Sequence, residues 1–253
     1  ALKFAGPHCL SACLTMWCPM KQLWQQQTEA LVRIGRSPEL ALSLVKQDSG
    51  QKFRNAVELF IRERFLEQHG AHIQYFMPCL LALVDSAGTL RGAVGLRNAA
   101  SGPLFLERYL ECPIEQLITQ KQPSGSGRVL DRNQIVEVGN LGTLAPGCAR
   151  LLIVALTDLL VAQGFRWISF TGTPLLINSF QRLGLNPLPV GEARAECLGA
   201  EGTAWGSYFA SNPQVMIGDI MGGHQSLLQS GLYQRLGLEA LYTMDGLNHV
   251  ACA

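Results

Sequence analysis

The hydrophobic pattern along the chain predicts strands and helices in a mixed order. Residues 40–45 alternate large aliphatic side chains with smaller or polar ones, which is typical of a short strand. Between residues 52 and 69, apolar side chains recur every three or four positions and charged ones occupy much of the other face. This spacing predicts an amphipathic helix that ends at Gly70.

A hairpin and a short helical segment are predicted next. Residues 73–84 and 90–97 are apolar runs joined by Asp85-Ser86-Ala87-Gly88, a sequence that favours a turn. Residues 104–120 contain a helical segment, and the Pro/Ser/Gly sequence at 123–127 is typical of a flexible loop.

The second half of the chain alternates strand and helix. We predict strands at 134–141 and 166–171, helices at 148–163 and 175–183, a strand pair at 187–193 and 205–209, an apolar run at 215–220, and a helix or helical hairpin at 222–243. This order favours βαβ packing, so the expected fold class is α/β, with a mixed, twisted central sheet flanked by helices.

Three regions are expected along the 253 residues. Residues 1–38 form an extension expected to be poorly ordered, with a Gln-rich linker or surface helix at 21–38 and, as an alternative, a degenerate signal peptide within 1–20. Residues 39–221 form the main domain, and residues 222–253 form a C-terminal helical tail. No apolar run reaches the ~18–20 residues that span a bilayer.

Charge and cysteine content narrow the function classes. A formal net charge of +1 gives no basic field for a phosphate backbone, so we expect no nucleic-acid partner. The eight cysteines are scattered without a CxxC pair, which favours a reducing, cytoplasmic location. His8 with Cys9, Cys13 and Cys18 matches no common zinc spacing, so we expect no metal.

A candidate anion site lies where the strand 134–141 meets the next helix. The backbone N–H groups of Cys148, Ala149 and Arg150 would point toward the strand end, where the helix dipole favours an anion. Gly147 would let a ligand approach the backbone, and Arg150 adds a positive charge. The alternative is an ordinary strand-to-helix turn.

Glu137 and Asn140 are polar residues in an otherwise apolar strand. A desolvated Glu137 would have a raised pKa and would suit a general base near neutral pH. The alternative is a structural ion pair between Glu137 and Arg97.

Several motifs within residues 50–222 resemble the thermostable hemolysin family. They are Arg62-Glu63-Arg64-Phe65, Gly92-Ala93-Val94-Gly95-Leu96-Arg97, Leu104-Phe105-Leu106-Glu107-Arg108-Tyr109-Leu110, Val136-Glu137-Val138-Gly139-Asn140-Leu141, Phe170-Thr171-Gly172-Thr173, Asn178-Ser179-Phe180-Gln181-Arg182-Leu183-Gly184-Leu185 and Trp205-Gly206-Ser207-Tyr208-Phe209. More remotely, the order of elements is similar to that of acyl-homoserine-lactone synthases and GNAT acetyltransferases.

The remote resemblance implies a GNAT-like fold with a splayed centre around 134–143 and 166–171. In those enzymes a Gln/Arg-x-x-Gly-x-Gly/Ala loop binds the pyrophosphate of coenzyme A or the phosphate of a carrier protein. Here the matching positions are Leu144, Gly147 and Ala149, so the small residues match and the first polar residue does not. Asn140 replaces an Arg of the central strand, and the paired acidic residues before the hairpin are missing, so homoserine-lactone formation is not expected.

The expected activity is acyl transfer from acyl-CoA or a phosphopantetheine-bound donor on an acyl-carrier protein to a small amine. The catalytic candidates are Glu137, Asn140 and Thr171; the donor-binding candidates are Leu141, Gly147, Cys148, Ala149, Arg150 and Asn178; and the acceptor-binding candidates are Arg97, Phe105, Tyr109 and Thr173.

Several of these candidates have a structural alternative. Thr171 and Thr173 also suit helix caps, Asn178 a surface amide, and Tyr109 simple packing. The helix N-terminus is expected to lower the pKa of Cys148, although no histidine lies near it in sequence to make it a nucleophile.

Two other functions remain open at this point. One is a membrane-active haemolysin or a lipid-binding effector without catalysis, and the other is a degenerate fold that binds an acyl carrier as a partner. Direct lysis requires a long amphipathic element that can be exposed on demand. The predicted helices are instead wholly apolar, as at 150–163, or suited to packing on a sheet.

Overall fold

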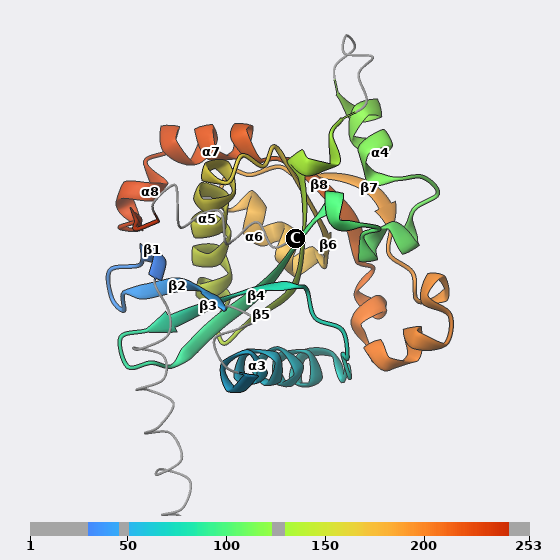
Figure 1. The fold of residues 1–253 in the computed structure, drawn as a ribbon, viewed down its shortest axis with the longest axis horizontal. Coiled ribbons are helices and arrows are strands. Elements are labelled where there is room, and N and C mark those ends of the chain that lie inside the picture. Colours follow the sequence, from blue (N-terminus) through green and yellow to red (C-terminus); the bar gives the residue numbers. More distant parts are fainter. Residues whose placement is uncertain (1–29, 46–50, 123–129, 243–253) are drawn as a thin grey trace, which may run out of the picture.

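The computed structural model describes residues 30–45, 51–122 and 130–242. These residues form one sheet with the strand order β7-β8-β6-β5-β4-β3-β2-β1-β9 (Figure 1). The strands are β1 (Ala30–Ile34), β2 (Leu40–Val45), β3 (Cys79–Asp85), β4 (Leu90–Asn98), β5 (Ile135–Thr143), β6 (Trp167–Gly172), β7 (Leu188–Glu192), β8 (Gln214–Asp219) and β9 (Glu239–Ala240).

The helices alternate with these strands in the second half of the chain. The α-helices are α3 (Gln51–His69), α4 (Ile114–Lys121), α5 (Pro146–Ala162), α6 (Pro174–Gln181), α7 (Ile220–Gln229) and α8 (Leu232–Arg235). The 3₁₀ segments are η1 (Ala99–Ser101), η2 (Phe105–Tyr109), η3 (Arg132–Gln134), η4 (Ala195–Trp205) and η5 (Tyr208–Ser211). The predicted loop at 123–127 and the His8/Cys9/Cys13/Cys18 group lie outside the described residues.

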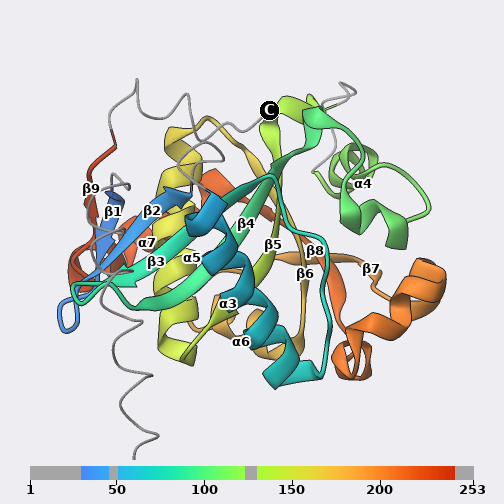
Figure 2. The ribbon, with the colours of Figure 1, turned by 60° about the horizontal axis from the view of Figure 1, so that its bottom comes forward.

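Helices cover both faces of the sheet. Alternate residues of β5 point to opposite faces: Val136 packs with α5 in the largest apolar cluster, whereas Ile135 packs with α4. Helix α3 covers β3, β4 and β5 on the same face as α4, and α6 and α7 flank α5 on the other face. Figure 2 shows α3 and α5 on opposite sides of the sheet.

The sheet is mixed, as predicted, and it opens near its centre. Strands β5 and β6 are parallel, because α5 connects them, and their other sheet neighbours are antiparallel. Their pairing runs from Ile135 opposite Trp167 to Val138 opposite Phe170, and there it stops although both strands continue. Beyond that point β5 stays paired with β4, and β6 stays paired with β8.

A bulge in β5 accompanies this opening. Ala93 and Gly95 of β4 lie opposite Gly142 and Gly139, so β5 has one more residue than β4 between these two pairs. Asn140 within the bulge has a φ of 51°, a left-handed conformation that asparagine tolerates better than most residues.

Some predicted elements differ from the structure. Residues 205–209 were expected to form a strand, but they form the junction of η4 and η5, because Gly206 has a φ of 54° that breaks extended backbone. The partner of β7 is instead β8. Residues 30–34, for which the sequence predicts a linker or surface helix, form β1, in which Val32 and Ile34 are fully buried.

None of the described helices is both long enough and apolar enough to cross a membrane.

Leu159 of α5 provides a test of where the core lies. Its side chain is 0% exposed, so Leu159→Ala should lower the free energy of unfolding by about 2–5 kcal/mol through lost burial and an added cavity. Leu228→Ala is the matched control, because Leu228 is 54% exposed on α7 and its loss should cost about 0.5 kcal/mol or less. Urea unfolding measures both, and equal losses would contradict the packing described here.

Candidate active site

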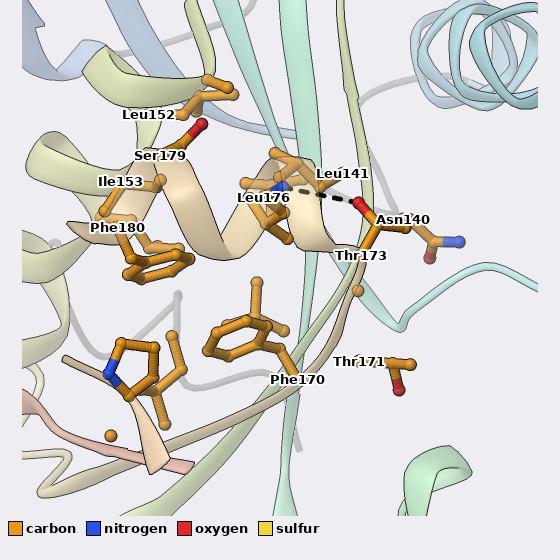
Figure 3. A pocket seen from close by; sticks show the side chains of 18 of the residues that line it. Asn140, Leu141, Leu152, Ile153, Phe170, Thr171, Thr173, Leu176, Ser179 and Phe180 are labelled. Atoms are coloured by element: carbon orange, nitrogen blue, oxygen red, sulfur yellow. Dashed lines mark hydrogen bonds between the residues drawn. The ribbon is translucent and has the colours of Figure 1, made fainter. Parts of the chain in front are cut away.

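A cavity of about 610 Å³ occupies the opening between β5 and β6. Its wall includes residues from α3, α5, α6 and α7 as well as from both strands, so it reaches both faces of the sheet. Figure 3 shows Leu152, Ile153, Phe170 and Phe180 gathered on one side of the strands, with Asn140 and Thr171 on the other side. The cavity therefore has two chemically different parts.

The part beside α5 and α6 is the aliphatic compartment, lined by Val138, Leu141, Leu152, Ile153, Leu156, Phe170, Leu176 and Phe180. The Phe170 and Phe180 rings stack with their centroids 4.8 Å apart. Leu144 and Leu175 also line the cavity, yet they are 41% and 71% exposed, so they lie at its rim. This compartment suits a hydrocarbon chain.

The part beside α3 is the aromatic compartment, lined by Phe65, His69, Phe105, Tyr109, Trp205 and Tyr208. The rings are in contact, with 5.8 Å between the centroids of Phe105 and Trp205 and 5.3 Å between those of Trp205 and Tyr208. Burial raises the pKa of Tyr109 and of Tyr208 well above the usual range, so both hydroxyls stay protonated.

Glu137 lies at the boundary of this compartment and is 2% exposed. Its Oε2 accepts a hydrogen bond from the Phe105 N–H at 3.0 Å, and its Oε1 accepts one from the Leu106 N–H at 2.9 Å. Burial raises the pKa of Glu137, although these two hydrogen bonds act in the opposite direction. The carboxylate therefore holds η2, and with it the Phe105 and Tyr109 rings, at the cavity.

Arg97 faces Glu137 across the β4–β5 pair, as the expected ion pair would require. Its Nη1 instead donates a 3.4 Å hydrogen bond to the Pro103 carbonyl oxygen, and its charge only moderates the pKa of Glu137. Arg97 is also one of the residues that line the cavity.

Glu107 fixes η2 from the other side. It accepts hydrogen bonds from the Leu104 N–H at 2.8 Å, the Ile114 N–H at 3.0 Å and the Arg132 guanidinium at 2.9 Å. Arg132 also pairs with Glu115 of α4. Burial alone would raise the pKa of Glu107, but these hydrogen bonds hold it below its ordinary value.

The N-terminus of α5 begins without a side-chain cap. Ala145 is the N-cap residue, and its carbonyl accepts the Cys148 N–H at 3.0 Å. A Cβ added at Gly147 would meet nothing within 4 Å, so the backbone there is open to approach. Ala149 lines the cavity, whereas Gly147, Cys148 and Arg150 are not among its lining residues.

The expected low pKa of Cys148 is wrong. Burial of the thiol raises its pKa, and this outweighs the nearby Arg91 charge and the helix N-terminus. Cys148 is therefore a thiol rather than a thiolate, and it does not suit a nucleophile.

Asn140 and Thr173 have structural hydrogen bonds. Asn140 Oδ1 accepts the Met77 N–H at 2.8 Å, and its Nδ2 donates to the Tyr75 carbonyl at 3.2 Å, which ties residues 75–77 to the β5 bulge. Thr173 Oγ1 accepts the Leu176 N–H at 3.4 Å as the N-cap of α6 (Figure 3).

The cavity brings together most of the residues predicted for the site. Its lining includes Arg97, Phe105, Tyr109, Glu137, Asn140, Leu141, Ala149, Thr171 and Thr173, and it does not include Asn178. It also contains His69, Trp205 and Tyr208, for which no site role was predicted. Within the ranges that the structure describes, no three His, Cys, Asp or Glu side chains are grouped to hold a metal ion.

The pH dependence of stability tests the role of Glu107. Because its folded-state pKa is lowered, its charge stabilises the fold above the ordinary Glu pKa, and this contribution is lost as the pH falls through the folded-state value. Glu107→Gln should lower the free energy of unfolding by about 1–3 kcal/mol at pH 7, with a smaller loss at pH 3.

Glu111→Gln is the matched control, because Glu111 is exposed on the same segment. Urea unfolding of the native chain and both variants at the two pH values gives the comparison. A Glu107→Gln loss that is the same at pH 3 and pH 7 would contradict a role for its charge.

Comparison with known proteins identifies a family and a fold. The sequence model described as "Thermostable hemolysin" matches residues 47–224. None of the curated proteins compared with the chain matches it. FeeM, an N-acyl amino acid synthase from uncultured soil microbes, has a similar structure, with a TM-score of 0.55 and 14% identity over 77% of this chain and 98% of that chain.

A second similar structure is BjaI, a CoA-dependent acyl-homoserine lactone synthase solved with SAM and isopentyl-CoA. It has a TM-score of 0.52 and 14% identity over 87% of this chain and 100% of that chain. At this level of identity the two likenesses establish the fold, which is the GNAT-like one.

Proposed function

The chain belongs to the thermostable hemolysin family, and from the cavity that crosses its sheet we propose that it is an N-acyltransferase. It would move an acyl group from a thioester to a small amine. The observation that carries this proposal is one continuous cavity with a hydrocarbon wall on one face of the sheet and aromatic and polar groups on the other. Such a cavity suits two unlike substrates that must meet at the opening between β5 and β6.

The donor would enter at the rim formed by Leu144, Leu175 and the first turn of α5. Its acyl chain would occupy the aliphatic compartment, and its phosphate would lie at the uncapped helix N-terminus, where Gly147 allows close approach and Arg150 adds charge. Acyl-CoA and a phosphopantetheine arm on an acyl-carrier protein share this chemistry. BjaI, which has the same fold, was solved with isopentyl-CoA.

The reaction needs only the two substrates. The amine nitrogen forms a bond to the thioester carbonyl carbon, the C–S bond breaks, and the proton lost by nitrogen ends on the leaving thiol. Beyond Val138 and Phe170 the facing edges of β5 and β6 no longer pair. Backbone N–H groups on β5 would stabilise the oxyanion. The scattered cysteines suit a cytoplasmic setting for this reaction.

Product formation tests the proposal directly. The full chain is incubated with acetyl-, octanoyl- or palmitoyl-CoA and a set of primary amines, and the released thiol and the amide product are both measured. We expect amide formation, with tighter binding of longer donors, because each buried CH₂ contributes about 0.8 kcal/mol.

Liposome leakage caused by the protein alone is measured in parallel, because it tests the competing membrane-active function. Leakage without any thioester turnover would overturn the transferase proposal.

Gly147→Ala separates donor binding from folding. The added methyl meets nothing within 4 Å and removes a glycine from a helix, so stability should stay equal or rise by about 0.5–1 kcal/mol. The methyl would obstruct a phosphate at the helix N-terminus and weaken acyl-CoA binding roughly tenfold, or about 1.4 kcal/mol.

Acyl-pantetheine, which lacks the phosphate, is the control ligand for Gly147→Ala, and its affinity should not change. Unaltered acyl-CoA affinity in a stable variant would contradict this placement of the phosphate.

A further inference from the structure

The C-terminus of α3 is clamped to the turn formed by residues 205–209, which we call the aromatic turn. The His69 carbonyl oxygen accepts hydrogen bonds from the Ser207 N–H at 2.7 Å and the Ser207 hydroxyl at 3.1 Å. Close by, the His72 N–H donates to the Ala204 carbonyl at 2.6 Å. Two segments that are far apart in sequence are therefore fixed to each other.

Gly206 makes this close approach achievable. Its φ of 54° and ψ of −126° disfavour L side chains, and a Cβ at this position would overlap the His69 carbonyl oxygen and the Gly70 backbone. A glycine is therefore required for the aromatic turn to touch α3. The clamp sets the position of His69 relative to Trp205 and Tyr208.

The His69 ring is half-buried and lines the aromatic compartment. It packs edge-on against Tyr208 with 5.2 Å between ring centroids, and the Phe65 ring lies 6.1 Å away. The Tyr208 hydroxyl donates to the Thr171 carbonyl at 3.5 Å. His69 is thus one aromatic ring away from the end of β6, where the sheet opens.

The other ionisable groups of this compartment are less suited to accept a proton. Burial raises the pKa of Glu137, but the side chain is 2% exposed and a backbone N–H of η2 occupies each of its oxygens. Arg97 is a cation, and Tyr109 and Tyr208 hold their protons. Tyr75 is 69% exposed at the rim. Burial lowers the pKa of His69, which keeps the imidazole neutral and able to accept a proton at neutral pH.

The residues around the imidazole indicate the kind of acceptor that the compartment would bind. Trp205, Phe105 and Tyr208 line the cavity with their rings in contact, and an aromatic lining favours a ligand with an aromatic or bulky apolar body. An amine on that body would face the neighbouring imidazole.

We propose that the aromatic compartment binds a primary amine with an aromatic or bulky apolar body, and that His69 is the catalytic base that takes the proton from its nitrogen. This inference rests on the proposed acyl transfer. The imidazole accepts the N–H proton as the C–N bond forms, and it returns that proton to the sulfur as the C–S bond breaks. Glu137 is then a positioning residue, because it acts by holding η2.

Variants of His69 test the base. With octanoyl-CoA and 2-phenylethylamine, His69→Gln should reduce kcat about 10²–10⁴-fold while octanoyl-CoA binding stays unchanged. Added imidazole should restore part of the activity of His69→Ala. Such rescue is not expected if the His69 side chain has only a structural role. His72→Gln is the matched control, because His72 is exposed three residues away, and it should keep native turnover.

A substitution of Trp205 tests the acceptor site separately. Trp205→Leu should raise KM for 2-phenylethylamine more than for butylamine, and 2-phenylethylamine alone should quench the fluorescence of the native chain but not that of Trp205→Leu. These measurements test the acceptor site even if the His69 variants do not fold.

The possible failures are distinguishable from one another. Native turnover by a folded His69→Gln variant would overturn the role of His69 as the base. Equal KM values of the native chain for 2-phenylethylamine and butylamine would overturn the aromatic acceptor site. The proposed acyl transfer stands in either case. Absence of both thioester binding and transfer by the native chain overturns the proposed function and this inference with it.

Discussion

The separation of β5 from β6 is the constraint on which the rest of the molecule depends. Two strands that part inside a sheet leave backbone N–H and C=O groups without sheet partners, and such groups must find ligands, water or side chains. The neighbouring strands hold β5 and β6 apart at this point. The bulge at Asn140 keeps β5 paired with β4, and β8 keeps β6 in place on the other side. The opening is therefore a fixed feature of the fold.

The polar network around η2 serves the same opening. Two carboxylates, Glu137 and Glu107, accept four backbone N–H groups from the short segment between Leu104 and Ile114. Without these hydrogen bonds the segment has little regular structure of its own, because it contains only the five-residue 3₁₀ helix η2. The two carboxylates thus hold the segment that carries the Phe105 and Tyr109 rings, one from the cavity wall and one from outside it.

Much of this architecture is predictable from the sequence, for identifiable reasons. Helix α3 and the β3–β4 hairpin follow from local periodicity and an Asp/Gly turn, and Glu137 is conspicuous as a charge in an apolar strand. The sequence predicts a strand at the aromatic turn because aromatic residues are common in strands as well as in turns, and the positive φ of Gly206 cannot be seen in the sequence. Local sequence does not point to His69, because its contact with residue 207 is long-range and leaves no local pattern. The predicted direction of the Cys148 pKa shift is wrong for another reason. Desolvation of the thiol raises its pKa by more than the helix dipole lowers it, and a sequence motif does not show burial.

A cavity that crosses the sheet also has a consequence for the product. A molecule made there would carry a hydrocarbon tail from one face, joined through an amide to the body of the amine from the other, so it would be lipid-like. Its exit would lead past Leu144 and Leu175, the exposed leucines at the rim, which offer the tail an apolar surface on its way to a micelle or bilayer. A lipid-like amide of this kind would partition into a bilayer, so the haemolysis in the name of the family would need no protein inserted in the membrane.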